Sequence, residues 1–249
     1  MLIVLILIAA LAPVFWLFAT IYMKDSAQPE PPKWLLKAFF YGVLAALLSL
    51  AYGLIVGSLF GVDVTNEQYS SLVEAVGDAF FLAAIPEELA KFIMLWLLLR
   101  KNPFFDEHFD GIVYSVCVGL GFAGLENVLY LINGMEDGSW ISIGIVRAMF
   151  SVPGHYFFAV IMGYFYSIYY FGVDRSIKTK VMVLLAPILV HGLFDSLLFS
   201  MQVNESLSLI LMILFFVFFS KLKKRAHARI DELVAKSGEV QDDSNQWVE

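Results

Sequence analysis

The chain has 249 residues, of which 60% are hydrophobic and 16% charged, and its mean hydropathy is +0.77. One soluble core cannot hide that much apolar surface, so the composition excludes a soluble globular protein and predicts an all-α polytopic membrane protein. The net charge of −7 lies mostly in acidic loops and the C-terminal tail, and it indicates no nucleic-acid partner. The single cysteine, Cys117, excludes an internal disulfide and a zinc site built from cysteines.

Seven apolar stretches are long enough, or nearly so, to cross a hydrocarbon core of about 30 Å as helices. They cover residues 2–23, 36–60, 76–99, 110–133, 141–171, 181–201 and 206–220. The first stretch lacks a basic start and a persuasive cleavage site, which favours a retained helix over a signal peptide. The fifth is too long for one straight crossing, and Pro153 within it predicts a break or kink. We therefore expect a bundle of about seven to eight transmembrane helices.

The chain divides into four predicted parts. Residues 1–75 hold two helices and an outer loop, 76–201 form the core of the bundle, 202–221 form the last transmembrane helix, and 222–249 form a cytoplasmic tail. The tail starts with the basic run KLKKRAHAR, which favours a short helix on the inner leaflet. From Ser237 onward the composition is typical of a disordered segment.

Lys and Arg in the connecting segments indicate the orientation, because they accumulate on the cytoplasmic side of a membrane. They occur in segments 24–37, 100–101, 175–180 and 221–229. These alternate with four segments that lack both residues, namely the N-terminus, 61–75, 134–140 and 202–205. The alternation predicts an outer N-terminus and a cytoplasmic C-terminus. At 1.5 Å per helical residue, Glu87 then lies roughly 16 Å below the outer surface, so a site around it is expected to open outward.

Ionisable residues inside the predicted helices are the functional candidates, because each costs about 2.5 to 3.5 kcal/mol at the centre of a membrane span. They and one asparagine lie on four helices: Glu87, Glu88 and Lys91; Glu126 and Asn127; Arg147 and His155; His191 and Asp195. Residues three or four apart share a helix face, so each helix presents a polar patch. We expect the four helices to bring these patches together inside the bundle.

Three of these residues also have plain structural interpretations. Lys91 can serve chiefly to neutralise a glutamate, because buried charges usually survive in pairs. Asn127 can form a helix-to-helix hydrogen bond. Arg147 is expected closer to the outer interface, where it can either extend its charged end to the surface or pair with Glu136 or Asp137.

Carboxylates and imidazoles in a low-dielectric pocket are suited to general acid and base catalysis. The chain has no HExxH, no GxSxG, no GxGD-like aspartate pair and no cysteine near a histidine. For a hydrolase, this leaves water as the expected nucleophile. Two adjacent glutamates can then divide the work, one taking a proton from water while Lys91 holds the other.

Four short motifs resemble those of the PrsW-type intramembrane proteases, relatives of the CAAX-protease and bacteriocin-processing superfamily. They are EELAK at 87–91, FAGLE at 122–126, HYFFA at 155–159 and HGLFD at 191–195, similar to EExxK, FxxxE, an HxxxxA-like motif and HxxxD. The CAAX branch has an arginine and a histidine where this chain has Lys91 and Glu126, which favours the PrsW branch.

The resemblance implies a metal-independent glutamate protease of a bacterial inner membrane, with a four-helix catalytic core and no cofactor. Its implied catalytic residues are Glu87, Glu88, Glu126, His155, His191 and Asp195. Among them Glu87 and His191 would activate water, and Lys91 and Asn127 would orient the site, Lys91 acting with Glu88. The implied substrate is a single-pass membrane protein such as an anti-sigma factor, cut on the outer side of the membrane.

Two alternatives stay open at this point, as does the oligomeric state. The first is a zinc-dependent intramembrane protease, because four of the candidates are competent zinc ligands, namely Glu126, His155, His191 and Asp195. The second is a membrane scaffold or a proton-coupled transporter, since carboxylates, histidines and proline-broken helices also build carriers.

Overall fold

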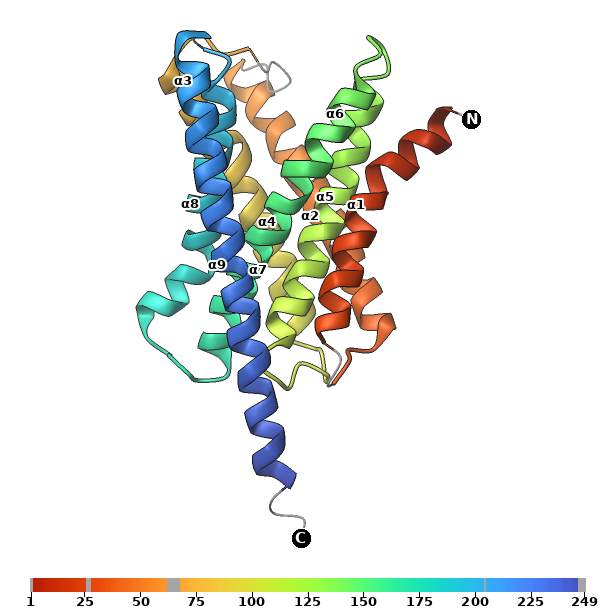
Figure 1. The fold of residues 1–249 in the computed structure, drawn as a ribbon, viewed down its shortest axis with the longest axis vertical. Helices are drawn as coiled ribbons and strands as arrows, with labels where there is room; N and C mark the ends of the chain where they lie inside the picture. The colour runs from red at the N-terminus through yellow and green to blue at the C-terminus, as the bar shows by residue number, and fades with distance from the viewer. Residues whose placement is uncertain (1, 26–27, 62–67, 204, 246–249) are drawn as a thin grey trace.

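The structure is a computed structural model that describes residues 2–25, 28–61, 68–203 and 205–245, with side chains up to residue 237. Within these residues every regular element is helical (Figure 1). The elements in chain order are α1 (Leu2–Lys24), α2 (Pro32–Phe60), α3 (Leu72–Asp78), η1 (Ala79–Ala84), α4 (Ile85–Leu99), α5 (Asp110–Asn133), α6 (Trp140–Val146), η2 (Arg147–Ser151), α7 (Val152–Tyr170), α8 (Ile177–Ser200) and α9 (Glu205–Asn245), where η marks a π-helix. The predicted all-α fold is confirmed.

Six helical runs in the described part are long and apolar enough to cross a membrane. They are Leu2–Lys24, Pro32–Phe60, Asp110–Asn133, Trp140–Tyr170, Ile177–Ser200 and Glu205–Ser237. The remaining predicted span forms the uninterrupted helical run of α3, η1 and α4, and this run carries the ionisable residues at positions 87, 88 and 91. The chain is therefore a polytopic membrane protein, and its most polar helical run is the one formed by α3, η1 and α4.

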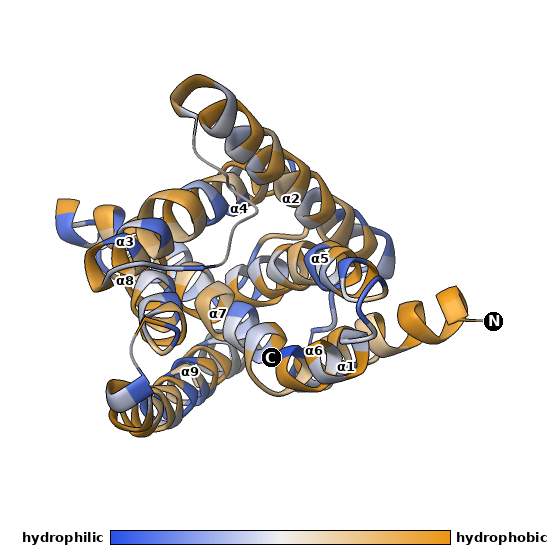
Figure 2. Ribbon diagram, turned by 90° about the horizontal axis from the view of Figure 1, so that it is seen from above, coloured by the Kyte–Doolittle hydropathy of each residue, from blue (hydrophilic) through white to orange (hydrophobic). Residues whose placement is uncertain are grey.

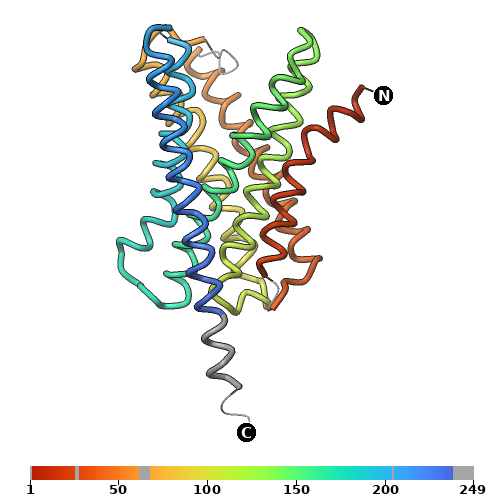
Figure 3. Tube along the Cα trace, in the orientation of Figure 1, coloured from red at the N-terminus to blue at the C-terminus, as the bar shows by residue number. Residues whose placement is uncertain are grey.

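The connecting segments that hold the basic residues lie at one end of the molecule. The trace in Figure 3 has the connections around 28–31, 100–109 and 171–176 at the end where α9 leaves the bundle. The start of α1 and the connections around 68–71, 134–139 and 201–203 lie at the opposite end. This grouping is what the alternation of basic and non-basic segments predicts. Which end faces the cytosol stays a prediction.

Helix α5 forms the centre of the bundle, and most of its residues are buried. Glycines let its neighbours approach backbone to backbone. A Cβ atom added at Gly121 would lie 2.0 Å from the carbonyl oxygen of Phe39 in α2, and one added at Gly163 of α7 would lie 2.3 Å from that of Gly111. Small residues at such crossings are the usual device for packing helices in lipid. Large apolar side chains instead remain exposed on α1, α2 and α9. Figure 2 colours much of these helices orange, which marks hydrophobic residues.

Of the break or kink predicted near Pro153, the break is absent, because the helical run continues from Trp140 to Tyr170. The chain passes through the π-helical turn η2 instead, and Pro153 is the second residue of the α-helix that follows. Pro86 has the same position in α4, directly after η1. A π-turn widens the helix, and such turns are frequent at functional sites. In both helices the first ionisable site residue after the proline lies within two positions of it, at Glu87 and at His155.

The helix does not end near residue 221, because α9 continues as one helix through the basic run. This part of α9 packs on the bundle through an apolar stripe, whose residues Leu222, Ala226, Ile230 and Leu233 are buried in the main core. Arg229 adds a polar contact to α7, donating from Nη1 to the hydroxyl of Tyr164 at 3.0 Å. The helix also runs past Ser237, where disorder was expected, as far as Asn245.

Candidate active site

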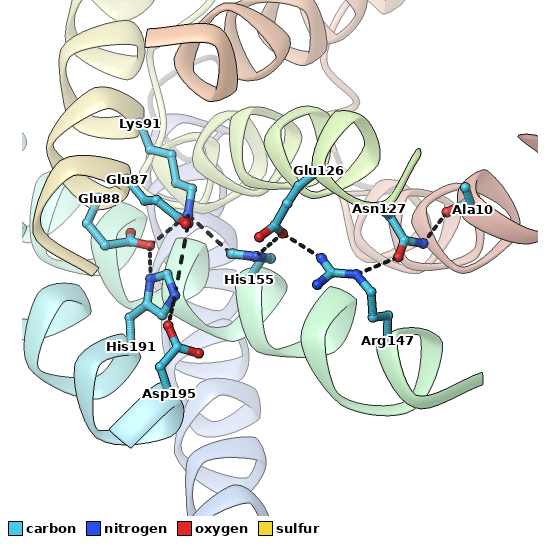
Figure 4. A network of polar contacts seen from close by, with 10 residues as sticks. All are labelled: Ala10, Glu87, Glu88, Lys91, Glu126, Asn127, Arg147, His155, His191 and Asp195. Atoms are coloured by element: carbon cyan, nitrogen blue, oxygen red, sulfur yellow. Dashed lines mark hydrogen bonds and ion pairs between the residues drawn. The ribbon is translucent and has the colours of Figure 1, made fainter. Parts of the chain in front are cut away.

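Four helices bring every predicted site residue into one network of hydrogen bonds and ion pairs (Figure 4). Helix α4 contributes Glu87, Glu88 and Lys91, α5 contributes Glu126 and Asn127, α7 contributes His155, and α8 contributes His191 and Asp195. The network also contains Arg147, at the start of η2, for which the sequence favoured a structural role closer to the outer interface.

Lys91 is the hub of this network. Its Nζ lies 2.8 Å from Oε1 of Glu88, 3.2 Å from Oε2 of Glu87 and 3.1 Å from Nδ1 of His155. The same ammonium group lies 3.9 Å from the centre of the Phe122 ring, within the range of a cation–π contact. The lysine therefore both neutralises the adjacent glutamates and fixes them relative to α7.

His191 lies between carboxylates. Its Nδ1 is 2.9 Å from Oε1 of Glu88, and its Nε2 is 3.0 Å from Oδ2 of Asp195 and 3.9 Å from Oε2 of Glu87. The ring stacks on Phe158 with a centroid distance of 4.5 Å. An ionised carboxylate can only accept, so Nδ1 donates to Glu88, and the carboxylates of Asp195 and Glu87 near Nε2 favour a positive charge on the ring. The surroundings of His191 thus favour the imidazolium.

His155 has different neighbours and a different protonation state. Its Nε2 lies 2.8 Å from Oε2 of Glu126, and its Nδ1 lies 3.1 Å from Nζ of Lys91. A lysine ammonium can only donate, so Nδ1 must accept and the proton belongs on Nε2. These contacts favour the neutral imidazole and make His155 a bridge from Lys91 to Glu126.

Arg147 completes the far side of the network. Its Nη2 donates to Oε2 of Glu126 at 2.7 Å, and its Nε donates to Oδ1 of Asn127 at 2.8 Å. The expected pairing with Glu136 or Asp137 is therefore wrong. The arginine holds two predicted site residues in place with one planar group, a geometry that lysine cannot reproduce.

The position of Arg147 follows from the helical hairpin that contains it. Glu126 lies seven residues before the last residue of α5, Asn133, and Arg147 lies seven residues after the first residue of α6, Trp140. Two helices joined by a short connection run side by side, so equal distances from the connection place residues at the same level. Counting from this connection was the available signal in the sequence.

Asn127 forms the helix-to-helix hydrogen bond that was one of its two interpretations. Its Nδ2 donates to the carbonyl oxygen of Ala10 in α1 at 2.7 Å, while its Oδ1 accepts from Arg147. The side chain is completely buried. Asn127 therefore anchors the network to the first helix.

The adjacent glutamates differ in their access to space. Glu87 lines a cavity of about 480 Å³, together with Glu126, His191 and Asp195. Glu88 does not line it; its side chain is completely buried, and its Oε2 has no hydrogen-bond partner in the described part of the chain. Glu87 is thus the glutamate that can contact a substrate or a water molecule, and Glu88 is a buried support.

The cavity leads from the network towards one end of the bundle. Its wall includes Ser142 of α6 and Gln202, just after α8. Both lie near the connections that lack Lys and Arg. The opening therefore lies on the side of the molecule that the charge pattern predicts to be outside.

Comparison with known proteins places the chain in a family. Residues 30–221 match a family model described as "PrsW family intramembrane metalloprotease". The chain belongs to this family. The protein "Protease PrsW" of Clostridioides difficile strain 630 is 34% identical over 218 residues, which cover 87% of this chain and 85% of that protein.

Further PrsW relatives agree. Those of Geobacillus kaustophilus and Bacillus subtilis are 33% and 34% identical over 195 and 199 residues, which cover 78% of this chain and 80% and 82% of the relatives. No solved structure matches the chain. The chain is therefore a PrsW-family intramembrane protease, and the scaffold and transporter interpretations lose their support.

The metal in the PrsW family description can be compared with this site. Donor atoms of Glu87, Glu88, His155 and His191 all lie within 4.8 Å of one another, and zinc accepts both imidazole and carboxylate ligands. However, the Lys91 ammonium already lies within hydrogen-bonding distance of three of these residues. A cation and this ammonium cannot share the place where the donors converge, so the observed arrangement does not fit a metal.

The structure corrects the set of zinc ligands that the sequence of this PrsW-family chain suggested, namely Glu126, His155, His191 and Asp195. Of the four ligands proposed from the sequence, two, His155 and His191, belong to the group of converging donors found in the described residues. Glu126 is taken up by His155 and Arg147, and Asp195 contacts Nε2 of His191. The carboxylates that converge with both histidines are Glu87 and Glu88 of α4.

Proposed function

We propose that the chain is a glutamate-type endopeptidase that uses water, without a metal, to hydrolyse a peptide bond of a membrane-anchored protein. The observation that carries this proposal is the pairing of Glu87 and His191 at the cavity wall. Oε2 of Glu87 and Nε2 of His191 are 3.9 Å apart. A water oxygen about 2.8 Å from each atom forms a hydrogen bond with both.

In the proposed reaction the Glu87 carboxylate takes a proton from this water. The hydroxide oxygen bonds to the carbonyl carbon of the substrate, whose oxygen gains a negative charge. The His191 imidazolium stabilises that charge, as fixed hydrogen-bond donors do in other hydrolases. Glu87 then gives its proton to the leaving nitrogen as the carbon–nitrogen bond breaks, which restores the ionised carboxylate.

The other network residues hold this pair in place. Glu88 and Asp195 each approach one nitrogen of His191. Lys91 reaches both glutamates of α4, and His155, Glu126 and Arg147 connect it to α5 and η2. Such support fixes reacting groups within the small tolerances that catalysis requires.

We further propose that the substrate is a single-pass membrane protein cut at or just outside the outer surface of a bacterial inner membrane. The cavity opens towards the end of the bundle whose connections lack Lys and Arg, which supports an outer opening. Extended substrate backbone is tolerated at membrane depth only inside such a protein-lined cavity. The resemblance of the four motifs supports an anti-sigma factor as the substrate.

Cleavage of candidate single-pass proteins by purified, reconstituted protein tests the catalytic pair. Glu87→Gln and His191→Ala should each lower the rate by about 10²-fold or more, as expected for loss of a general base or a charge-stabilising donor. Glu136→Gln, the same chemical change at an exposed loop position, should leave the rate unchanged. Undiminished cleavage by both site variants would remove the pair from the mechanism.

Cysteine labelling tests the proposed orientation. The native Cys117 is buried, so a cysteine introduced on the surface can be followed by itself. A cysteine at Glu136 should react with an impermeant thiol reagent added to intact cells, and one at Val173 should not. The reverse pattern would invert the topology and move the proposed cut to the cytoplasmic side.

A zinc-dependent protease is the second candidate. The observation in its favour is the convergence of four donor atoms from Glu87, Glu88, His155 and His191. It requires Lys91 to leave its three partners, which would expose an unpaired ammonium group inside the bundle. We therefore favour the metal-free mechanism.

A further inference from the structure

A second group of buried carboxylates lies at the other end of the bundle. It comprises Asp25 and Glu30, between α1 and α2, and Glu107 and Asp110, at the entry to α5; we call it the basal cluster. The two connecting segments lie beside each other at the end where α9 leaves the bundle (Figure 1). Sixteen residues of α5 separate Asp110 from Glu126, or roughly 24 Å along the helix. The basal cluster is therefore distinct from the proposed active site.

The carboxylates of the basal cluster converge. One oxygen each of Asp25, Glu107 and Asp110 lies within 4.8 Å of the others. Asp110 is completely buried, and Asp25 and Glu30 are 2% and 3% exposed. Acidic groups on a surface are common and need no ligand, but acidic groups removed from water require a partner.

Hydrogen bonds within the described chain satisfy only part of this cluster. Oδ2 of Asp110 accepts from the backbone N–H groups of Asp106 and Glu107 at 2.9 and 2.8 Å. Oδ1 of the same side chain is buried and has no partner. Glu30 accepts from the hydroxyl of Tyr114, and Oδ2 of Asp25 accepts from the backbone N–H of Glu30.

Positive charge is missing from the basal cluster. Among the described residues no Lys, Arg or His forms an ion pair with any of its four acids. Lys24, next to Asp25, pairs with Asp231 at 3.2 Å, and the ring of His108, next to Glu107, packs on Phe171. Burial raises the pKa of Asp25 to about 6 and those of Glu30 and Glu107 to about 7, with the neighbouring carboxylates adding to the effect for Glu30 and Glu107. The cluster therefore attracts either protons or a cation.

We propose that Asp25, Glu107 and Asp110 bind one divalent cation, Mg²⁺ or Ca²⁺. Every converging donor is an oxygen, and carboxylate oxygens without nitrogen or sulfur ligands select such hard cations. The unpartnered Oδ1 of Asp110 supplies a ligand that the chain itself leaves unused. Bound there, the cation fastens the connection after α1 to the start of α5.

The site also adjoins the last helix. The backbone N–H of Phe109 donates to Oγ of Ser237 in α9 at 3.1 Å, between two of the proposed ligand positions in the sequence. A cation that fixes this segment therefore also stabilises its contact with α9. The expected role is structural, and it is independent of proteolysis.

Thermal unfolding of the full chain in detergent, first stripped of divalent ions with a chelator, tests the proposal. Mg²⁺ or Ca²⁺ at about a hundredfold excess over its Kd should raise Tm by about 5 to 10 °C. Asp110→Asn and Glu107→Gln should remove most of this rise. Glu107 is only partly buried, so its variant should fold even if that of Asp110 does not.

Two control variants separate this site from other acids. Asp231→Asn changes an exposed carboxylate nearby, and Glu87→Gln changes the other buried cluster, so both should keep the full rise. Equilibrium dialysis should find one ion bound per chain in the wild type and none in Glu107→Gln.

Three results would overturn the proposal. One is a Tm that neither ion changes but that rises when the pH is lowered from 8 to 5, because protons alone would then satisfy the carboxylates. Another is a rise that Glu87→Gln removes, which would assign the ion to the active site. The third is an equal rise in every variant.

Discussion

Two groups of buried carboxylates share helix α5, one around Glu126 and the other around Asp110, and they are compensated in opposite ways. In the active-site network Lys91, Arg147 and His191 each lie within 3.2 Å of a carboxylate oxygen. The basal cluster has backbone N–H groups and a tyrosine hydroxyl but no cation from the described chain. A fixed internal cation keeps a buried acid ionised and positioned, which suits catalysis. An acid without one must take its positive charge from solution.

The largest effect is expected from removing Lys91, the internal cation that compensates the two glutamates of α4. Lys91→Met should lower the free energy of unfolding by about 3 to 5 kcal/mol, because it leaves the buried Glu88 and Glu87 without their shared partner. Unfolding in mixed detergent micelles measures the change. Lys178→Met, at an exposed position, should stay within about 0.5 kcal/mol of the wild type. A Lys91 variant as stable and as active as the wild type would contradict the proposed role of the lysine.

Arg147 offers a finer test, because its charge can be kept while its shape is lost. Arg147→Lys retains one positive charge but cannot reach Glu126 and Asn127 together. We expect the turnover number to fall by about 10²-fold through misplacement of Glu126 and His155, with KM little changed. Arg225→Lys on the exposed side of α9 is the matched control. A positioning role for Arg147 would be contradicted if kcat fell equally in both variants or fell in neither of them.

The smallest expected effect belongs to the outermost member of the network. Asn127→Ala removes the hydrogen bond to Ala10 and leaves Arg147 Nε unsatisfied, which should lower stability by about 1 to 2 kcal/mol. Asn133→Ala, at the exposed end of the same helix, should change it by less than about 0.5 kcal/mol. Equal unfolding free energies for the two variants would show that α1 is not anchored through this contact.

The sequence carries most of the active site because ionisable residues in an apolar run have few explanations. Glu87, Glu88 and Lys91 identify a functional helix because ionisable residues inside a membrane span cost free energy. The i, i+4 spacing of His191 and Asp195 places both on one helix face. The ion-pair partner of each residue is harder to predict, since it depends on which turns of two neighbouring helices lie at the same depth. Arg147 was therefore assigned to Glu136 or Asp137, which lie closer in sequence than Glu126.

Other features depend on competition between signals. The basic residues of α9 dominated the interpretation of the tail, although the spacing of Leu222, Ala226 and Ile230 already indicated one buried face. The π-helical turns before Pro86 and Pro153 depend on packing in the assembled bundle and leave no pattern in composition. The basal cluster depends on two loops meeting, which no local sequence pattern shows.

Cleavage by metal-free protein is the most direct test of the central claim, that Glu87 and His191 activate water without a metal ion. Purified protein would be treated with a chelator, its zinc content measured, and its rate on a reconstituted single-pass substrate compared before and after zinc is added back. The proposed mechanism predicts the same rate for untreated protein, for chelator-treated protein and for protein given zinc again. The zinc content after chelation should be far below one ion per chain. Loss of cleavage on chelation, with recovery at one zinc ion per chain, would contradict it and assign the four converging donors to a metal.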